Sequence, residues 1–205
     1  MSSSAFKVLS LVLSAFAIVQ MTIGGDPDIL TDFIAPANGI IDGNFFTFTG
    51  FRALSGQKTP PQAFKVIKAS GAEFPALIGQ SVSYAVLEFP AGSINPPHTH
   101  PRSAELLLVT QGSLQVGFVD TTNKLFTQSL QAGDMFVFPK GLVHFQHNAD
   151  ANKPALALSA FGSANAGTVS LPNTLFNSSI DDTVLALAFK TQVSTIQSLK
   201  KAFAP

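Results

Sequence analysis

The chain has 205 residues, of which 46% are hydrophobic and only 12% are charged, whereas about a quarter of the residues in an ordinary soluble domain are charged. This composition excludes a disordered, self-repelling chain and predicts that neighbouring subunits cover much of the surface. Twelve basic residues balance twelve acidic ones without any basic run, which argues against a nucleic-acid partner. Cysteine is absent, so disulfides, thiolate metal sites and cysteine nucleophiles are excluded together.

The first 25 residues are typical of a secretory signal peptide. Lys7 is the only charge, a nearly unbroken apolar stretch fills positions 8–23, and the small residues Gly24 and Gly25 follow. The alternative, a membrane anchor, needs a span of about 20 apolar residues. We therefore expect residues 1–25 to be a signal peptide, residues 26–205 to form one mature domain, and the protein to be secreted. No later segment is long and apolar enough to cross a membrane.

The mature chain predicts a single all-β domain. Irregular residues 26–43 contain several Pro, Asn and Gly breakers, and an aromatic-rich alternating pattern over residues 45–50 then predicts the first strand. Short strands between Gly and Pro turns, with no repeat or linker that would imply a second domain, indicate a sandwich or barrel. The further predicted strands are 81–89, 105–109, 113–119, 125–130, 135–138, 143–148 and 155–161.

The C-terminal part changes to a helical pattern. Asp181 and Asp182 open the apolar segment TVLALAFKTQ, and Ser194 is the expected cap of a second helix, TIQSLKKAF. The first helix is apolar nearly all round and must be buried, and an interface with another subunit suits it better than the core of one β domain. Shortly before it, Asn177 begins an Asn-Ser-Ser glycosylation sequon, which is usable in the secretory pathway.

Three of the four histidines fall into one constellation. His98 and His100 are two residues apart in an extended segment, so both imidazoles point to the same face. Glu105 follows a Pro-Arg turn at the start of the next strand, and a turn marked by a Pro and a Gly precedes His144. Ordinary histidines on a sheet are the alternative, but so few histidines gathered beside turns favour a metal site.

The spacing leaves the identity of the metal open. Three imidazoles and one carboxylate suit Fe, Mn, Co, Ni, Cu or Zn, and four ligands on an octahedral ion leave about two positions for water and substrate. This indicates an open, catalytic type of site. His147 lies three residues beyond His144, so on a strand it points to the opposite face, and we expect it to be a surface or interface residue.

Two segments resemble both cupin boxes in the long form found in germin-like proteins of plants. They are GSINPPHTHPRSAELLLVTQG and GDMFVFPKGLVHFQHN, and the start DPDILTDF is similar to the beginning of mature germins. The resemblance covers residues 26–205. It implies a single cupin β jelly-roll barrel with a C-terminal α-helical arm, a homo-oligomer that is a hexamer built as a trimer of dimers, and a place in the apoplast or cell wall. It also implies manganese, held by His98, His100, Glu105 and His144.

Two departures from the germin pattern bear on structure and substrate. Germins usually carry a disulfide near the N-terminus, but here Ile34 stands at the first cysteine position, so we expect packing alone to hold the N-terminal arm. In oxalate-oxidising germins, two asparagines near the metal bind oxalate. Asn95 matches one of them, and Ala85 stands where the other would fall. The resemblance therefore favours superoxide dismutase activity with a role in defence, ahead of oxalate oxidase, and a non-enzymatic, metal-stabilised binding protein of the wall is the third alternative.

Two amides are expected near the metal. Gln146, two residues after His144, shares the inward face, and a hydrogen bond from its amide can tune the metal. An ordinary strand glutamine paired with backbone or water is the equal alternative. Asn95 matches the family, but its place before Pro96 and Pro97 also fits a turn residue.

Overall fold

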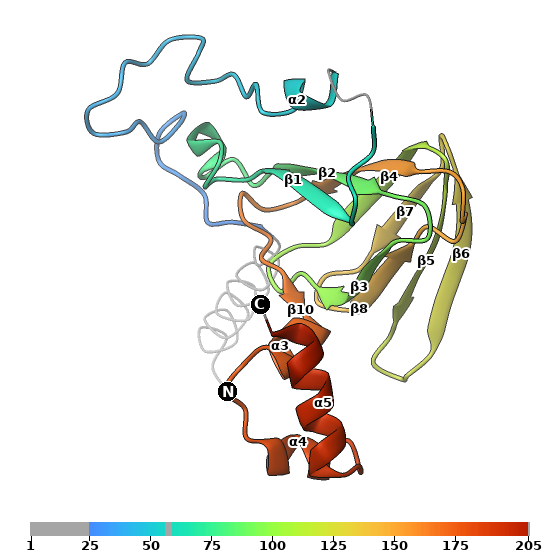
Figure 1. The fold of residues 1–205 in the computed structure, drawn as a ribbon. Coiled ribbons are helices and arrows are strands. Elements are labelled where there is room, and N and C mark those ends of the chain that lie inside the picture. Colours follow the sequence, from blue (N-terminus) through green and yellow to red (C-terminus); the bar gives the residue numbers. More distant parts are fainter. Residues whose placement is uncertain (1–24, 56–58, 205) are drawn as a thin grey trace, which may run out of the picture.

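The computed structural model of the chain describes residues 25–55 and 59–204. Two five-stranded antiparallel sheets face each other, and a helical arm lies beside one end of them (Figure 1). The strand orders are β1-β2-β9-β4-β7 and β10-β3-β8-β5-β6. The predicted all-β jelly-roll barrel with a C-terminal α-helical arm is confirmed. The proposed signal peptide, apart from Gly25, lies outside the described residues.

The strands and helices have the following bounds. The first sheet holds β1 (Lys65–Ala69), β2 (Ser83–Phe89), β9 (Ala155–Phe161), β4 (Glu105–Gln111) and β7 (Met135–Phe138). The second holds β10 (Val169–Ser170), β3 (Ile94–Thr99), β8 (Val143–His147), β5 (Ser113–Val119) and β6 (Leu125–Gln131). The helices are α2 (Arg52–Ser55), the 3-10 turn η1 (Pro75–Leu77), α3 (Leu171–Phe176), α4 (Asp182–Ala188) and α5 (Val193–Phe203).

Alternation along the strands sends apolar side chains into the space between the sheets. The centre of the core is formed by fully buried residues such as Phe89, Leu107, Val116 and Phe138. Predicted strands from residue 81 onward match observed ones to within two residues at either end. The prediction missed β1, β3 and β10. In β3 the cause is Pro96-Pro97, which the sheet accommodates by a register shift between Asn95 and His98.

The strand predicted over residues 45–50 is wrong, because Phe45 and Phe46 lie in a turn, residues 47–49 have no regular structure, and another turn begins at Gly50. The Asp42 carboxylate accepts hydrogen bonds from the backbone N–H groups of Asn44 at 2.8 Å and Phe45 at 3.3 Å. The aromatic residues pack on each other, with ring centroids 4.8 Å apart for Phe45 and Phe46 and 5.1 Å apart for Phe33 and Phe46. Such local side-chain hydrogen bonds give the backbone an alternative to a sheet ladder.

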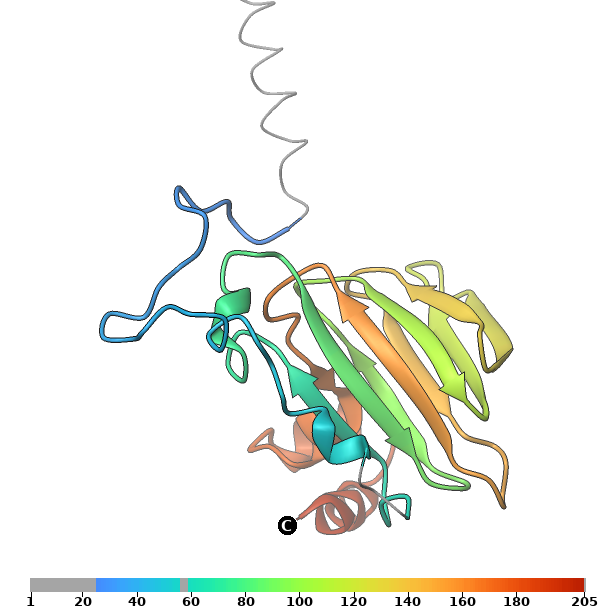
Figure 2. The ribbon, with the colours of Figure 1, turned by 90° about the horizontal axis from the view of Figure 1, so that it is seen from above.

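The expectation that packing alone holds the N-terminal arm is also wrong. The arm runs away from the sheets before it returns at α2 (Figures 1 and 2). Near its start, the Asp26 carboxylate accepts hydrogen bonds from Ser163 Oγ and from the backbone N–H of Ala164, both at 2.6 Å. Gln80 Nε2 also donates to the backbone carbonyl of Asp32 at 3.2 Å. Hydrogen bonds between segments far apart in sequence thus supplement the packing.

The C-terminal arm packs its three helices around a small core of its own, which includes Leu185, Ala186 and Ile196. Asp181 and Asp182 lie at the start of α4 as predicted, and the Asp181 side chain also caps the helix by accepting from two backbone N–H groups of the first turn. The prediction that Ser194 caps the last helix is wrong, because α5 begins at Val193 and Gln192 precedes it. The cap residue has moved because the helix starts two residues earlier than its apolar pattern suggests. No helix in the described part of the chain is long and apolar enough to span a membrane.

Within the described residues, two apolar surfaces are exposed on the single chain. One is on the arm, where Val184, Leu187 and Phe189 are at least half exposed. The other is the outer face of the first sheet, where residues on adjoining strands pair in register. We call it the outer sheet face, and it consists of Tyr84, Leu106, Leu108, Met135, Val137, Leu158 and Ala160.

Candidate metal centre

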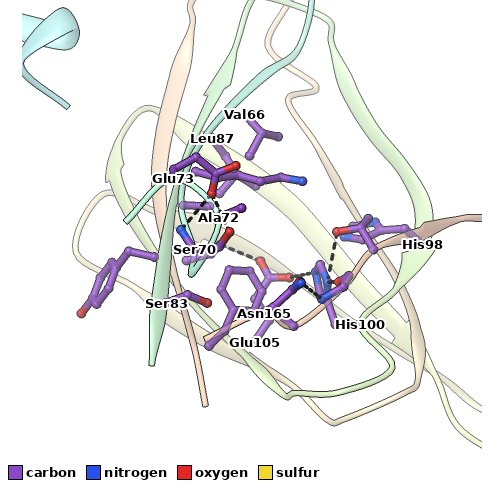
Figure 3. Close-up of a pocket in the computed structure, with 18 of the residues that line it drawn as sticks. Val66, Ser70, Ala72, Glu73, Ser83, Leu87, His98, His100, Glu105 and Asn165 are labelled. Carbon is purple, nitrogen blue, oxygen red and sulfur yellow. Dashed lines mark hydrogen bonds and ion pairs between the residues drawn. The ribbon is translucent and has the colours of Figure 1, made fainter. Parts of the chain in front are cut away.

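Both sheets contribute to one buried polar cluster. His98 on β3 and His144 on β8 are paired across neighbouring strands of the second sheet, while Glu105 begins β4 in the first sheet. His100 lies just beyond the end of β3. All four side chains are buried, and their ligand atoms lie within 4.8 Å of one another. Figure 3 shows His98, His100 and Glu105 converging from opposite sides of the pocket.

Backbone carbonyls fix the orientation of each imidazole. His98 Nδ1 lies 2.8 Å from the carbonyl oxygen of Pro96. His100 Nδ1 lies 2.5 Å from that of Gly167, and His144 Nδ1 lies 2.9 Å from that of Leu142. A carbonyl can only accept, so each Nδ1 carries a proton and donates it. The opposite ring atom, Nε2, therefore presents the nitrogen available to a ligand, as in many metal-binding histidines.

Two of these Nε2 atoms face the same carboxylate oxygen. Glu105 Oε2 lies 3.0 Å from His100 Nε2 and 3.1 Å from His144 Nε2. Nitrogen and oxygen lone pairs this close repel unless a positive charge, either a proton or a metal cation, lies between them. The donor set of three nitrogens and one carboxylate oxygen fits a divalent transition metal.

The electrostatics of the cluster keep His98 neutral and Glu105 ionised. Burial, reinforced by the neighbouring His144, lowers the pKa of His98 to about 4, so its Nε2 is free of a proton at neutral pH. Burial alone would raise the pKa of Glu105, but its close contacts with the imidazoles of His100 and His144 outweigh burial and lower this pKa. A neutral imidazole and an ionised carboxylate are the forms that metals bind.

A layer of polar side chains surrounds Glu105 on its other side. Glu105 Oε1 accepts hydrogen bonds from Ser159 Oγ at 2.6 Å and from Gln146 Nε2 at 3.1 Å. Asn95 Nδ2 donates to Gln146 Oε1 at 2.7 Å and lies 3.4 Å from His98 Nε2. Both predicted amides therefore lie beside the cluster. The sequence interpretation missed Ser159, although it is the only polar residue on the inward face of strand β9.

A cavity of about 600 Å³ adjoins the cluster. Its walls include the apolar residues Val66, Leu87 and Phe161 and, at its polar side, Asn165. Ala85 also lines this cavity, at the position where a second asparagine would bind oxalate in the germin pattern. His147 is outside both the cluster and the cavity and is half-buried, as expected for a residue three positions after His144.

Comparison with known proteins identifies the family. The sequence profile named Cupin matches residues 53–197. The chain is 59% identical to the putative germin-like protein 9-2 of Oryza sativa subsp. japonica, over 100% of this chain and 98% of the relative. This chain belongs to the germin-like proteins of the cupin family. It is also 60% identical to germin-like protein 9-3 of the same plant, over 98% of each.

Solved structures agree with this membership. A structure of oxalate oxidase superposes with a TM-score of 0.76 at 34% sequence identity and covers 87% of this chain and 98% of its own. A second, of oxalate oxidase with the substrate analogue glycolate, has the same TM-score at 32% identity. The germin-like barrel described above is therefore close in shape to an enzyme of defined chemistry.

Proposed function

We propose that His98, His100, Glu105 and His144 bind one manganese ion, and that this germin-like protein is a secreted superoxide dismutase. The observation that carries the proposal is the meeting of imidazole Nε2 atoms at Glu105 Oε2, at 3.0 and 3.1 Å. Every Nδ1 is engaged by a carbonyl, so the free ring nitrogens are directed to one point. Manganese is preferred because the resemblance to germins implies it and because a donor set of three imidazoles and one carboxylate suits this ion.

Dismutation converts two superoxide anions and two protons into dioxygen and hydrogen peroxide, and a bound metal would accept one electron in the first half-reaction and return it in the second. The protein's residues bind the metal, admit the substrate and hold the ligands in place. Four ligands would leave open positions on a six-coordinate ion, and the cavity that adjoins the cluster has room for a small anion. Asn95 and Gln146 form a hydrogen-bonded pair beside His98 and Glu105, and this pair holds the imidazole and the carboxylate in place.

Oxalate oxidase is the second candidate, favoured by the two neighbouring structures and by Asn95, which lines the cavity. Ala85 weighs against it, because a methyl group offers no donor to a dianion that must replace its hydration shell. A third candidate is a non-enzymatic wall protein in which the metal stabilises the barrel or binds a small ligand. Such a protein would contain the metal but turn over neither substrate.

The N-terminal segment and a sequon near the C-terminal arm support a secreted mature protein. Residues 1–25 are proposed to be removed as a signal peptide, leaving residues 26–205 as the cupin domain in the apoplast or cell wall. Asn177 is proposed as a glycosylation site, since it is exposed and directly follows α3.

We also propose that the protein is a homo-oligomer, with a hexamer made of three dimers as the expected form. The exposed residues of the arm and the outer sheet face are two separate apolar surfaces. Two distinct interfaces are what a trimer of dimers requires. Large apolar patches are uncommon on monomeric soluble proteins.

One purified sample tests the competing functions. Elemental analysis should find about one manganese per chain, and superoxide loss should be measured beside hydrogen peroxide production from oxalate. We expect superoxide dismutation and little oxalate turnover. Robust oxalate turnover would reverse the order of the two enzymes, and metal without either activity would favour the binding protein. Zinc alone, or no metal, would refute the manganese assignment.

A further inference from the structure

Strand β9 contributes one polar side chain to the interior, and its position is unusual. Ser159 is completely buried and lies level with Ala85 on β2 and Leu107 on β4. The other inward positions of β9 are Ala155, Ala157 and Phe161. A buried hydroxyl costs free energy unless it is hydrogen-bonded, and the partner of this hydroxyl is the carboxylate of Glu105, at 2.6 Å.

The two oxygens of Glu105 have different surroundings. Oε1 accepts from Ser159 Oγ and Gln146 Nε2, whereas Oε2 faces the imidazoles of His100 and His144. Both donors approach Oε1 from outside the cluster. The shorter of the two contacts is the one from Ser159, at 2.6 Å against 3.1 Å for Gln146. Hydrogen bonds to a charged acceptor are the strong ones, so the carboxylate is held against rotation mainly by this hydroxyl.

We propose that Ser159 is a positioning residue that keeps Glu105 a one-oxygen ligand and so sets how many coordination positions stay open. This rests on the proposed metal centre. With Oε1 occupied by two donors, only Oε2 is offered to the metal, and three imidazoles plus one oxygen leave about two positions on an octahedral ion. If Oε1 were released, it would be a buried acceptor with one donor fewer. It would turn toward the cation, and one open position would close.

The number of open coordination positions that Ser159 maintains determines which substrates the site can bind. A substrate that binds through two atoms needs two open positions, whereas a diatomic anion needs one. Ser159 therefore keeps the centre able to take a bidentate ligand, even though Ala85 provides no amide to hold one. The residue tunes access to the metal without touching substrate.

The test is Ser159→Ala, which removes one oxygen atom and little volume. The matched control is Ser83→Ala, because Ser83 is also buried and lines the same cavity, but its Oγ donates to the backbone carbonyl of Ser163 at 2.7 Å. Each protein is loaded with Mn²⁺, and the water-proton relaxivity per bound ion, which counts exchanging waters, is measured. We expect Ser159→Ala to fall to about half of the wild-type relaxivity, whereas Ser83→Ala and Ser159→Thr should match the wild type.

Equal relaxivity in Ser159→Ala and the wild type would overturn the proposal. If folded Ser159→Ala binds no Mn²⁺, crystal structures of the wild type and the variant loaded with Co²⁺ decide, since the proposal requires Glu105 Oε1 to turn toward the cation in the variant. An unmoved carboxylate would refute it. Failure of the wild type to bind Mn²⁺ would instead refute the proposed metal centre, and the same crystallographic comparison would still test the role of Ser159.

Discussion

The interior cluster and the outer sheet face each reverse the usual distribution of side chains in a soluble protein. The cluster is polar but buried, and the outer sheet face is apolar but exposed. Charged and polar side chains of the cluster are almost completely buried between the sheets, whereas Leu106, Met135 and Val137 are exposed on the outside of the first sheet. The two regions are the two faces of the same strand, since Glu105 and Leu106 are neighbours on β4.

The proposed function assigns a different partner to each region. In that proposal a metal ion lies between the imidazole nitrogens and the Glu105 carboxylate, and a second copy of the chain covers the outer sheet face. The two partners would bind opposite faces of one strand, so perturbing one face should leave the other intact.

The largest expected effect is loss of the metal in His100→Ala. This substitution removes one of the imidazoles directed at Glu105 Oε2, so manganese content should fall from about one per chain to almost none while the β-rich fold and the assembly remain. Elemental analysis and circular dichroism measure the two properties. His147→Ala is the control, because His147 lies outside the cluster, and it should retain full metal content. Full occupancy in His100→Ala would contradict the proposed ligand set.

The converse change is Val137→Lys on the outer sheet face. A lysine here would be buried without a partner in any interface that covers this face, at a cost of several kcal/mol. We expect smaller assemblies by light scattering, with manganese per chain unchanged. Thr127→Lys, on an exposed strand position of the other sheet, is the control. An unaltered oligomer in Val137→Lys would place the interface elsewhere.

The metal-free cluster should make the fold sensitive to acid. The pKa of His98 is about 4 in the folded chain against an ordinary value of 6.5. Between these two pH values the unfolded chain therefore binds more protons, and the free energy of unfolding falls as the pH is lowered through this window. The loss reaches about 3 kcal/mol at most.

The lowered pKa of Glu105 acts in the same direction at more acidic pH, since its stabilisation is present above the ordinary carboxyl pKa and lost on protonation. Urea unfolding with a chelator, at a series of pH values, measures the effect. His98→Gln should flatten the dependence between pH 6.5 and 4. An equal slope in this variant would assign the acid sensitivity to other groups.

The smallest expected effect concerns substrate choice. Ala85→Asn would add an amide to the cavity wall, and one hydrogen bond of about 1 kcal/mol corresponds to a rise in oxalate turnover of roughly tenfold or less. Hydrogen peroxide production from oxalate is the measurement. Ala85→Val fills similar space without a donor and should show no rise. An equal gain in both variants would mean that cavity shape, rather than the amide, limits oxalate.

The sequence predicted the cluster better than it predicted the chain around it. Strand alternation, a local property, places His98 and His100 on one face, and the resemblance to the cupin boxes completes the ligand set with Glu105 and His144. Ser159 was missed because its meaning depends on β9 lying beside β4, a pairing between residues far apart in sequence.

The strand prediction from the aromatic pattern at residues 45–50 failed for the opposite reason. Alternation predicts a strand only where another strand is available to pair with it, and here the turn around Asp42 provides local hydrogen bonds instead. In β3 the backbone pairs despite Pro96, because the neighbouring strand tolerates a shift in register. Both errors concern tertiary pairing, which periodicity does not encode.

The attachment of the N-terminal arm through Asp26 has a consequence for how the protein responds to reductants. With no cysteine in the chain, nothing in this attachment can be locked or released by thiol exchange. The arm attaches and detaches in a local equilibrium that does not depend on the redox state of the solution. Asp26 accepts hydrogen bonds from the Ser163 side chain and the Ala164 backbone N–H, and these residues lead into the loop whose Gly167 carbonyl orients His100. Detachment of the arm would therefore alter the orientation of the His100 imidazole. Hydrogen exchange of the Ala164 backbone amide measures this detachment, and its rate should be the same in oxidising and in reducing solution.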